Sequence, residues 1–441
     1  MSERKPQIKL GLSIAGHGYH HSAWLHPSVP PEGINEFGFY LDLTRTAERG
    51  LFDMVFLADF VVFSMVDVPK GVLGRSSRGS FEPLTLLAAL APQTECVGLV
   101  ATASTTFGVP YHVARSFASL DMLSSGRAGW NVVTSFQDEE AANFGSATIL
   151  EKSSRYDRAE EFVDVVLGLW DSLAPDAYVC DRQSGYLFDP AKVRTLNHVG
   201  RHFRVKGPLG TPRSAQGRPV VVQAGASEEG QELAARTADV VYSVQPRLET
   251  AQAFYAGLKG RMAKYGRDPD HLKVMPGLLP VLGGTEAEAK RRFREMQELI
   301  DPLVGLRYLS AIFGDLSGHP IDGPVPELRK DKQLATRAQL ILDLARRNNW
   351  SIRQLYESTA IGNTHNTVVG TPEQVADVME AWILGRGADG FNLLPALSPL
   401  SVQEFVDEVV PVLQRRGLYR REYEARTLRE NLGLPAPPTA H

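Results

Sequence analysis

Polar side chains stand at the end of a buried, apolar run in this sequence, and their types suggest a ligand site. The run Ala128 to Val133 is apolar apart from Asn131, and Thr134 and Ser135 follow it. An amide and two hydroxyls offer neutral hydrogen-bond partners. Ligands of α/β proteins bind at the carboxyl edge of the sheet, where such a strand end lies. The same side chains could instead satisfy the backbone of their own loop.

A second segment could hold a phosphate group. The sequence has no glycine-rich dinucleotide fingerprint and no Walker loop, but Gln223 to Gly230 places small residues between an apolar run and a helical pattern. Free backbone N–H groups at a helix start favour a phosphate monoester, and the Ser227 hydroxyl would add a donor. Ser227 followed by two glutamates also matches an ordinary helix N-cap, so both interpretations stay open.

Three further positions are candidates for the same edge of the sheet. Asp59 ends an apolar run, so its carboxylate falls at the catalytic rim, whereas Asp53 starts the run and falls at the opposite end. Thr102 to Thr106 supplies hydroxyls after another run, although threonine also suits strands. Tyr156 opens a long amphipathic helix, where its phenol could reach a phosphate or simply pack.

Four histidines crowd the loop after the first apolar run, at positions 17, 20, 21 and 26. No carboxylate stands among them, and the nearest are Glu32 and Glu36, so a metal site is disfavoured. The loop lies on the expected active face, and imidazole titrates near neutral pH. A role in handling protons or lining a substrate is therefore favoured, and we predict no metal.

The composition is that of an ordinary globular protein and excludes several classes. Hydrophobic residues make up 43% and charged residues 22% of the 441 residues, with a formal net charge of −4 and no basic run, which argues against nucleic-acid binding. No apolar stretch is long enough for a membrane span or signal core. Cys96 and Cys180 are too far apart to suggest a disulfide framework. We therefore expect a soluble, cytoplasmic protein.

Short apolar runs alternate with amphipathic helical patterns, which predicts a parallel sheet. We expect strands at 8–14, 52–59, 97–104, 127–135, 219–225, 239–244, 272–282 and 390–396, and helices at 37–49, 81–94, 110–123, 155–173, 228–237, 250–265, 372–384 and 402–415. Eight parallel strands with right-handed crossovers close most naturally into a barrel. The predicted fold is a TIM (β/α)8 barrel that forms a single domain over residues 1–441.

Two stretches interrupt the alternation and are predicted to be insertions, after strands four and seven. Residues 178–206 have the pattern of a β-rich excursion, and residues 285–367 that of helices interrupted by the Gly/Pro-rich segment 314–326. Excursions of this length in barrel loops are commonly lids. From about residue 420, the sequence predicts a C-terminal tail that wraps the periphery.

Six segments carry a family resemblance: Ala47 to Asp53, Ala118 to Asp121, Ser125 to Ser135, Asn143 to Gly145, Gln223 to Ser227 and Gly387 to Asn392. As a set they resemble the luciferase-like, two-component flavin monooxygenases. The most similar subgroup contains the nitrilotriacetate, EDTA and dibenzothiophene-sulfone monooxygenases and the long-chain alkane monooxygenase. The resemblance spans residues 8 to about 433.

This resemblance implies both a fold and a reaction. Members are TIM barrels that take reduced FMN (FMNH2) from a separate NAD(P)H-dependent flavin reductase. They add O2 at flavin C4a to form a hydroperoxide and pass one oxygen atom to a small organic substrate. We therefore expect a monooxygenase that hydroxylates its substrate or cleaves a C–N or C–S bond, and that forms a homodimer or homotetramer. Substrate specificity is expected in the loops 60–80 and 314–326.

The resemblance also implies the site residues. The FMN contacts of the family fall on Asp59, Thr102, Ser104, Asn131, Lys152, Tyr156, Ala226 and Ser227. Lys152 stands where members often carry histidine, so an imidazole contact would become a point charge. The position of the histidine loop, and not the resemblance, gives the catalytic candidates His20 and His21: we expect one or the other to border flavin C4a and to hold or deprotonate the substrate.

Two alternative functions stay open at this point. One is a deazaflavin-dependent hydride-transfer enzyme on the same barrel. The other is a flavin-binding protein that catalyses no reaction, although the polar rim argues against a decayed site.

Overall fold

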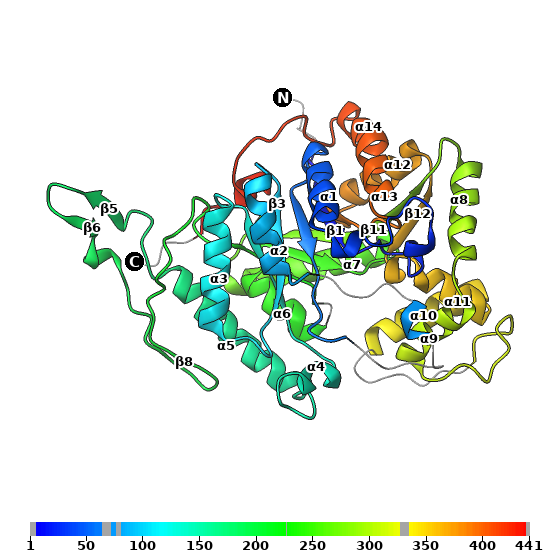
Figure 1. Ribbon diagram of the computed structural model, residues 1–441, viewed down its shortest axis with the longest axis horizontal. Coiled ribbons are helices and arrows are strands. Elements are labelled where there is room, and N and C mark those ends of the chain that lie inside the picture. The colour runs from blue at the N-terminus through cyan, green and yellow to red at the C-terminus, as the bar shows by residue number, and fades with distance from the viewer. Residues whose placement is uncertain (1–5, 64–71, 76–80, 226, 327–334, 438–441) are drawn as a thin grey trace.

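A closed barrel of eight parallel strands forms the centre of the computed structural model, which describes residues 6–63, 72–75, 81–225, 227–326 and 335–437 (Figure 1). The barrel strands are Lys9–Ile14 (β1), Met54–Leu57 (β2), Gly98–Ser104 (β3), Ala128–Val133 (β4), Val220–Gln223 (β9), Val240–Ser243 (β10), Lys273–Leu282 (β11) and Gly390–Leu393 (β13). They pair in this order, and β13 closes the ring by pairing with β1. The predicted TIM barrel is confirmed.

Helices surround the barrel at the predicted positions (Figure 1). They are Phe37–Arg49 (α1), Pro83–Leu90 (α2), Pro110–Leu123 (α3), Lys152–Trp170 (α5), Glu228–Thr237 (α6), Leu248–Arg261 (α7), Pro372–Leu384 (α12), Leu400–Glu404 (α13) and Val410–Arg415 (α14). The last predicted helix is divided, because a π-helical turn, Phe405–Val409, joins α13 to α14. No helix in the described ranges is long and apolar enough to cross a membrane.

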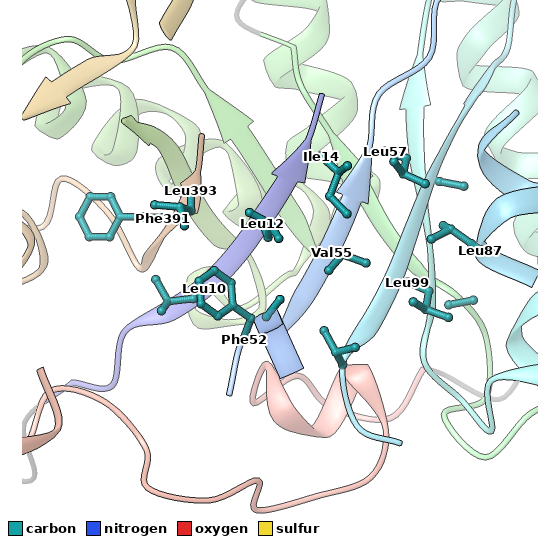
Figure 2. Packing of buried hydrophobic residues seen from close by; sticks show 14 of the residues in the cluster. Leu10, Leu12, Ile14, Phe52, Val55, Leu57, Leu87, Leu99, Phe391 and Leu393 are labelled. Atoms are coloured by element: carbon teal, nitrogen blue, oxygen red, sulfur yellow. The ribbon is translucent and has the colours of Figure 1, made fainter. Parts of the chain in front are cut away.

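Alternation along each strand decides which side chains face the helices and which face the barrel interior. Figure 2 shows the outer positions of β1, which are Leu10, Leu12 and Ile14. These side chains pack with Val55, Leu57 and Leu99 of neighbouring strands and with helix residues in the largest buried cluster. The intervening positions face inward, and Thr102 on β3 and Asn131 on β4 are among them.

A tight turn brings the chain from α3 into β4. Ser125 and Gly126 both have positive φ, 55° and 86°, and a Cβ on Gly126 would lie 3.1 Å from the backbone nitrogen of Gln216. The guanidinium of Arg127 is buried and donates to the Thr94 hydroxyl and to surrounding carbonyl oxygens. These contacts fix the start of β4, and thereby the position of its polar end.

The C-terminal tail closes the amino-terminal end of the barrel. Leu428, Leu432 and Leu434 are buried with inward-facing barrel side chains, and Leu428–Asn431 forms α15. Gly98 leaves room for this plug, because a Cβ there would lie 2.6 Å from Leu428. The expectation of a peripheral wrap was wrong, since these leucines enter the barrel end and gain the burial of a core position.

Two short hairpins lie between α5 and β9. Tyr178–Asp181 (β5) pairs with Tyr186–Phe188 (β6), and His198–Val199 (β7) pairs with Arg204–Val205 (β8). The β5–β6 hairpin projects away from the barrel (Figure 1). Asp138–Ala142 forms the short helix α4 after β4.

A helical subdomain follows β11. It contains Glu286–Glu298 (α8), Pro302–Phe313 (α9), Ala335–Asn348 (α10) and Ile352–Ala360 (α11), and the last three share a hydrophobic cluster of their own. One strand was not predicted: Asn366–Gly370 (β12) pairs in parallel with the carboxyl-terminal half of β11, from Leu278 to Leu282. The prediction of helices up to residue 367 missed this strand, because β12 is only five residues long. It pairs with β11, which at ten residues is long enough to hold an additional strand beside it.

Candidate active site

Two of the predicted polar residues, Thr102 on β3 and Asn131 on β4, lie side by side next to the end of β2. The Asn131 amide donates to the Thr102 hydroxyl at 2.9 Å, and that hydroxyl donates to the Leu57 carbonyl at 2.9 Å. Asn131 is buried, and its Oδ1 has no hydrogen-bond partner among the described residues. A buried acceptor without a donor costs free energy, so Oδ1 is suited to accept a hydrogen bond from a ligand.

Ser104 belongs to a second hydrogen-bonded group at the same rim. Its hydroxyl lies 2.9 Å from that of Ser135, which in turn donates to the buried Glu140 carboxylate at 3.2 Å. Glu140 also accepts from two backbone N–H groups, and Arg155 donates to the Ser135 carbonyl at 2.6 Å. This network holds the loop after β4 in place. Sequence reasoning missed Glu140 and Arg155, because both lie in helical patterns that look like solvated faces.

Asp59 lies just beyond β2 and is half-buried. Burial raises the pKa of its carboxyl above the usual value, and the nearby carboxylates of Glu82 and Glu140 act in the same direction. The backbone N–H of Phe60 opposes them in part. A hydrogen-bond donor from a ligand would stabilise the ionised form of Asp59.

Two residues of the predicted phosphate site, Tyr156 and Ser227, meet where the starts of α5 and α6 lie together. The Tyr156 hydroxyl lies 3.3 Å from that of Ser227, and Ser227 caps α6 by accepting the Gly230 N–H at 3.2 Å. Gly225 and Gly230 pack against each other: a Cβ on Gly230 would lie 3.0 Å from both the Tyr156 hydroxyl and the Gly225 Cα. The two glycines thus keep the space beside the hydroxyls free of side chains.

Lys152 begins α5 and forms an ion pair with Glu229 at 2.7 Å. Lys152 and Tyr156 are one turn apart on the same helix face, so the structure brings Lys152, Tyr156 and Ser227 together. Ala226, the other predicted contact in this segment, lies outside the described residues.

The four clustered histidines face different surroundings. His17 contacts the Pro31 carbonyl at 2.8 Å, and His26 contacts the Ser28 hydroxyl at 2.7 Å. His20 is buried, and its Nδ1 accepts the Ser22 N–H at 3.2 Å. His21 is half-buried and places its ring edgewise against Tyr308 of α9, with 4.4 Å between ring centroids. Within the described part of the chain, no group of three or more His, Cys, Asp or Glu side chains could hold a metal ion.

His20 is expected to make the protein less stable in acid. Burial lowers the pKa of His20 from 6.5 to about 4, and His21 adds to the effect while Gln297 opposes it. Between these values the folded state binds fewer protons than the unfolded state, so stability is present above pH 6.5 and is lost as pH falls. Compared with a His20→Gln variant, the parent should lose up to about 3 kcal/mol more unfolding free energy over this range. Urea unfolding at several pH values measures it, and parallel curves would contradict it.

His365 is a further rim residue that sequence reasoning missed. It precedes β12, and a Cβ on Gly277 of β11 would lie 2.1 Å from its Nδ1. Gly277 pairs in register with Asn392, whose buried Oδ1 lacks a hydrogen-bond partner in the described structure. A glycine inside an apolar strand is the one sequence signal, because it marks the close approach of another group.

Aromatic side chains stand on the loops beside the polar rim. Phe107 and Phe144 stack in parallel with 4.4 Å between their ring centroids, and Phe144 is half exposed. The Asn143 amide donates to the Val61 carbonyl at 2.9 Å, which ties this loop to the one after β2. Apolar loops of this kind could cover a bound ligand and exclude water.

A cavity of about 330 Å3 lies elsewhere, between α8 and the start of α13. Of the histidines in the loop after β1, His26 lines this cavity. The residues predicted to be catalytic or cofactor-binding do not line it. Its arginines are committed to nearby carboxylates, since Arg292 pairs with Glu404 at 2.8 Å and with Glu288 at 3.3 Å. The polar rim is therefore the better candidate site.

A closed parallel barrel with amide and hydroxyl groups at its carboxyl rim is the architecture of a TIM-barrel enzyme. The chain belongs to the luciferase-like monooxygenase family, which it matches over residues 17–389.

Similar proteins include several monooxygenases. The N-acetyl-S-(2-succino)cysteine monooxygenase of Bacillus subtilis (strain 168) is 47% identical, and the match covers 99% of each chain. Nitrilotriacetate monooxygenase component A of Aminobacter aminovorans is also 47% identical, with 98% of this chain and 97% of the relative covered. The structure of EDTA monooxygenase (EmoA) from Chelativorans sp. BNC1 has a TM-score of 0.84 at 34% identity, covering 98% of this chain and 100% of that one.

Proposed function

We propose that this protein is an FMNH2-dependent monooxygenase, the oxygenating component of a two-component system that acts on a small organic substrate. The observation that carries the proposal is the meeting of Tyr156, Ser227 and the Gly225–Gly230 pair at the rim of a luciferase-like barrel. Relatives at 47% identity over nearly the whole chain are named as monooxygenases, which favours this function over hydride transfer from a deazaflavin.

The residues present fit FMN. The cradle at Gly230 is a space that a Cβ would fill, beside two hydroxyls and a helix start, which suits a phosphate monoester. The orphaned Asn131 Oδ1 suits an N–H donor such as those of a reduced flavin ring. We assign Lys152, Tyr156, Ala226 and Ser227 to the phosphate end, and Asp59, Thr102, Ser104 and Asn131 to the rest of the flavin.

When bound, reduced FMN would supply the reaction with O2 that transfers one oxygen atom to the substrate. The protein's task is then positioning and exclusion of water, because water entry would release the oxygen as hydrogen peroxide. We assign the substrate side to His20 and His21 in the loop after β1. His20 is buried, and because burial lowers its pKa to about 4 its imidazole is a weak base, so we assign proton exchange with the substrate to His21.

The relatives suggest the chemistry of the substrate. One is named for a succinylated cysteine thioether and another for nitrilotriacetate, so both names describe carboxylates whose carbon chains are joined through a sulfur or a nitrogen atom. We propose a substrate of this kind, oxidised next to the heteroatom with hydroxylation or with cleavage of a C–S or C–N bond.

We propose that an NAD(P)H-dependent flavin reductase supplies the reduced FMN. One relative is named as a single component of nitrilotriacetate monooxygenase, and the name of another marks it as one of the chains of the pristinamycin IIA synthase of Streptomyces pristinaespiralis. Both names thus imply a further protein. A cytoplasmic homodimer or homotetramer completes the proposal, and the free thiols of Cys96 and Cys180 suit a reducing compartment.

The isolated protein is expected to be nearly colourless and to bind reduced FMN at micromolar concentration, because the flavin comes from a diffusing donor. Anaerobic titration with reduced FMN measures this. Oxygen uptake and product analysis follow, with a panel of thioethers, amines and heterocycles that do or do not carry carboxylates. A tightly held, stoichiometric nicotinamide, or no response to reduced FMN, would contradict the proposal.

Removing one hydroxyl from the phosphate site is expected to weaken flavin binding. Ser227→Ala and Tyr156→Phe should each cost about 1.5–3 kcal/mol of FMN affinity, the scale for a hydrogen bond to a charged group. Riboflavin, which lacks the phosphate, serves as the matched ligand and should bind both variants as it binds the parent. Equal FMN affinity in correctly folded variants would show that the phosphate binds elsewhere.

A further inference from the structure

The ion pair between Lys152 and Glu229 places a negative charge where the proposed function requires an anion to bind. Glu229 is the second residue of α6, beside the Ser227 cap, and Lys152 is one turn before Tyr156 on α5. The pair therefore spans the two helix starts that form the proposed phosphate site. A carboxylate there competes with a phosphate for the same lysine and the same helix end.

Glu229 and Lys152 form a close ion pair. The two charged atoms lie 2.7 Å apart, and the contact with Lys152 is the main reason that the pKa of Glu229 lies below its usual value. Glu229 is therefore ionised at neutral pH. Its side chain is 43% exposed and that of Lys152 49% exposed, so an arriving anion can reach both and dissolved salt screens both.

The neighbouring residue does something different. Glu228 carries the same charge at the first position of α6, but it pairs with Arg261 of α7 at 2.6 Å, on the side away from α5. The chain thus offers two adjacent glutamates at one helix start, of which only Glu229 faces Lys152 in the described structure.

We infer that Glu229 partly neutralises Lys152 and weakens the grip of this site on the FMN phosphate, so that flavin can enter and leave at each turnover. The inference rests on the proposed function. A two-component enzyme takes its flavin from a separate reductase and must release it again. A phosphate monoester carries up to two negative charges near pH 7, so one opposing carboxylate has a large influence.

The test compares reduced FMN with reduced riboflavin in anaerobic titrations of the parent and four variants. Glu229→Gln should bind reduced FMN about tenfold more tightly at low salt, and the gain should shrink as salt is added. Glu228→Gln, the matched control, should change the affinity by less than about twofold, because its charge is directed at Arg261. Riboflavin affinity should stay the same in both variants.

Two further variants separate the pair from either charge alone. Lys152→Met leaves Glu229 without its partner beside the phosphate and should weaken FMN binding about tenfold. Lys152→Met combined with Glu229→Gln should return the affinity to within about threefold of the parent. Thermal melting of each variant checks folding.

The inference is overturned if Glu229→Gln and Glu228→Gln have the same effect, or if riboflavin follows FMN. A parent that binds reduced FMN while Glu229→Gln does not tighten it overturns this inference alone. A parent that does not bind reduced FMN overturns the proposed function together with it.

Discussion

Replacing His21 with alanine is expected to lower coupled product formation about 100-fold, the scale for losing a general acid or base. Flavin affinity should change by less than about 1 kcal/mol, because the proposed phosphate site lies on α5 and α6 and not on the β1 loop. His21 lies between this loop and the helical subdomain, with its ring against Tyr308 and its backbone N–H on the Ala360 carbonyl. In that position the His21 imidazole could hold a substrate that the helical subdomain covers.

The measurement is the ratio of product to hydrogen peroxide at saturating reduced FMN. Peroxide should rise as product falls. His26→Ala is the matched control, because it removes an imidazole of the same loop whose Nδ1 contacts the nearby Ser28 hydroxyl and not the helical subdomain residue Tyr308. Coupling that is unchanged in His20→Gln, in His21→Ala and in the double variant would show that these histidines are structural.

The barrel was predictable because its signals are local. Each strand is a short apolar run, each helix an amphipathic pattern, and eight alternations leave one closed arrangement. The polar rim was predictable for the same reason, since Asn131 and Thr102 are polar residues in the second halves of apolar strands. Their hydrogen bond confirms that the two strand ends lie side by side.

What could not be predicted depends on contacts between distant segments. In the sequence, Gly277 only interrupts an apolar strand. The structure gives the reason for the glycine, because the His365 ring lies against it. The sequence gives no sign that Leu428, Leu432 and Leu434 are buried, because their burial depends on the end of the barrel against which they pack. Likewise, no local pattern shows that Glu229 and not Glu228 turns toward Lys152, because that choice is made by where α5 and α7 lie.

The local sequence left the role of Ser227 open between a helix cap and a phosphate ligand, and the family resemblance favoured the phosphate ligand. The structure shows that it does cap α6, and that its hydroxyl lies beside that of Tyr156. The two roles do not compete, because a hydroxyl that accepts the Gly230 N–H keeps its own proton, which it donates here to the Tyr156 hydroxyl and could redirect to a phosphate oxygen. Flavin binding should therefore depend on the space around Ser227 as much as on its hydroxyl.

Gly230→Ala is expected to weaken FMN binding by about tenfold or more. The new methyl group would lie 3.0 Å from the Tyr156 hydroxyl and from the Gly225 Cα, so it must displace one of them and enter the proposed phosphate site. Alanine is the better helix former by about 1 kcal/mol, so the variant should still fold. Riboflavin binding should change less than FMN binding, because the added methyl group acts at the phosphate end.

Gly257→Ala provides the matched control for this substitution. Gly257 lies within α7, and a Cβ there would meet nothing within 4 Å, so the same change adds helix propensity without a new contact. It should raise the melting temperature and leave flavin affinity unaltered. Calorimetric titration with FMN and riboflavin, together with thermal melting, compares the two variants. If Gly230→Ala binds FMN as tightly as Gly257→Ala does, the glycine pair is a packing contact between β9 and α6, and the phosphate site must be sought elsewhere on the rim.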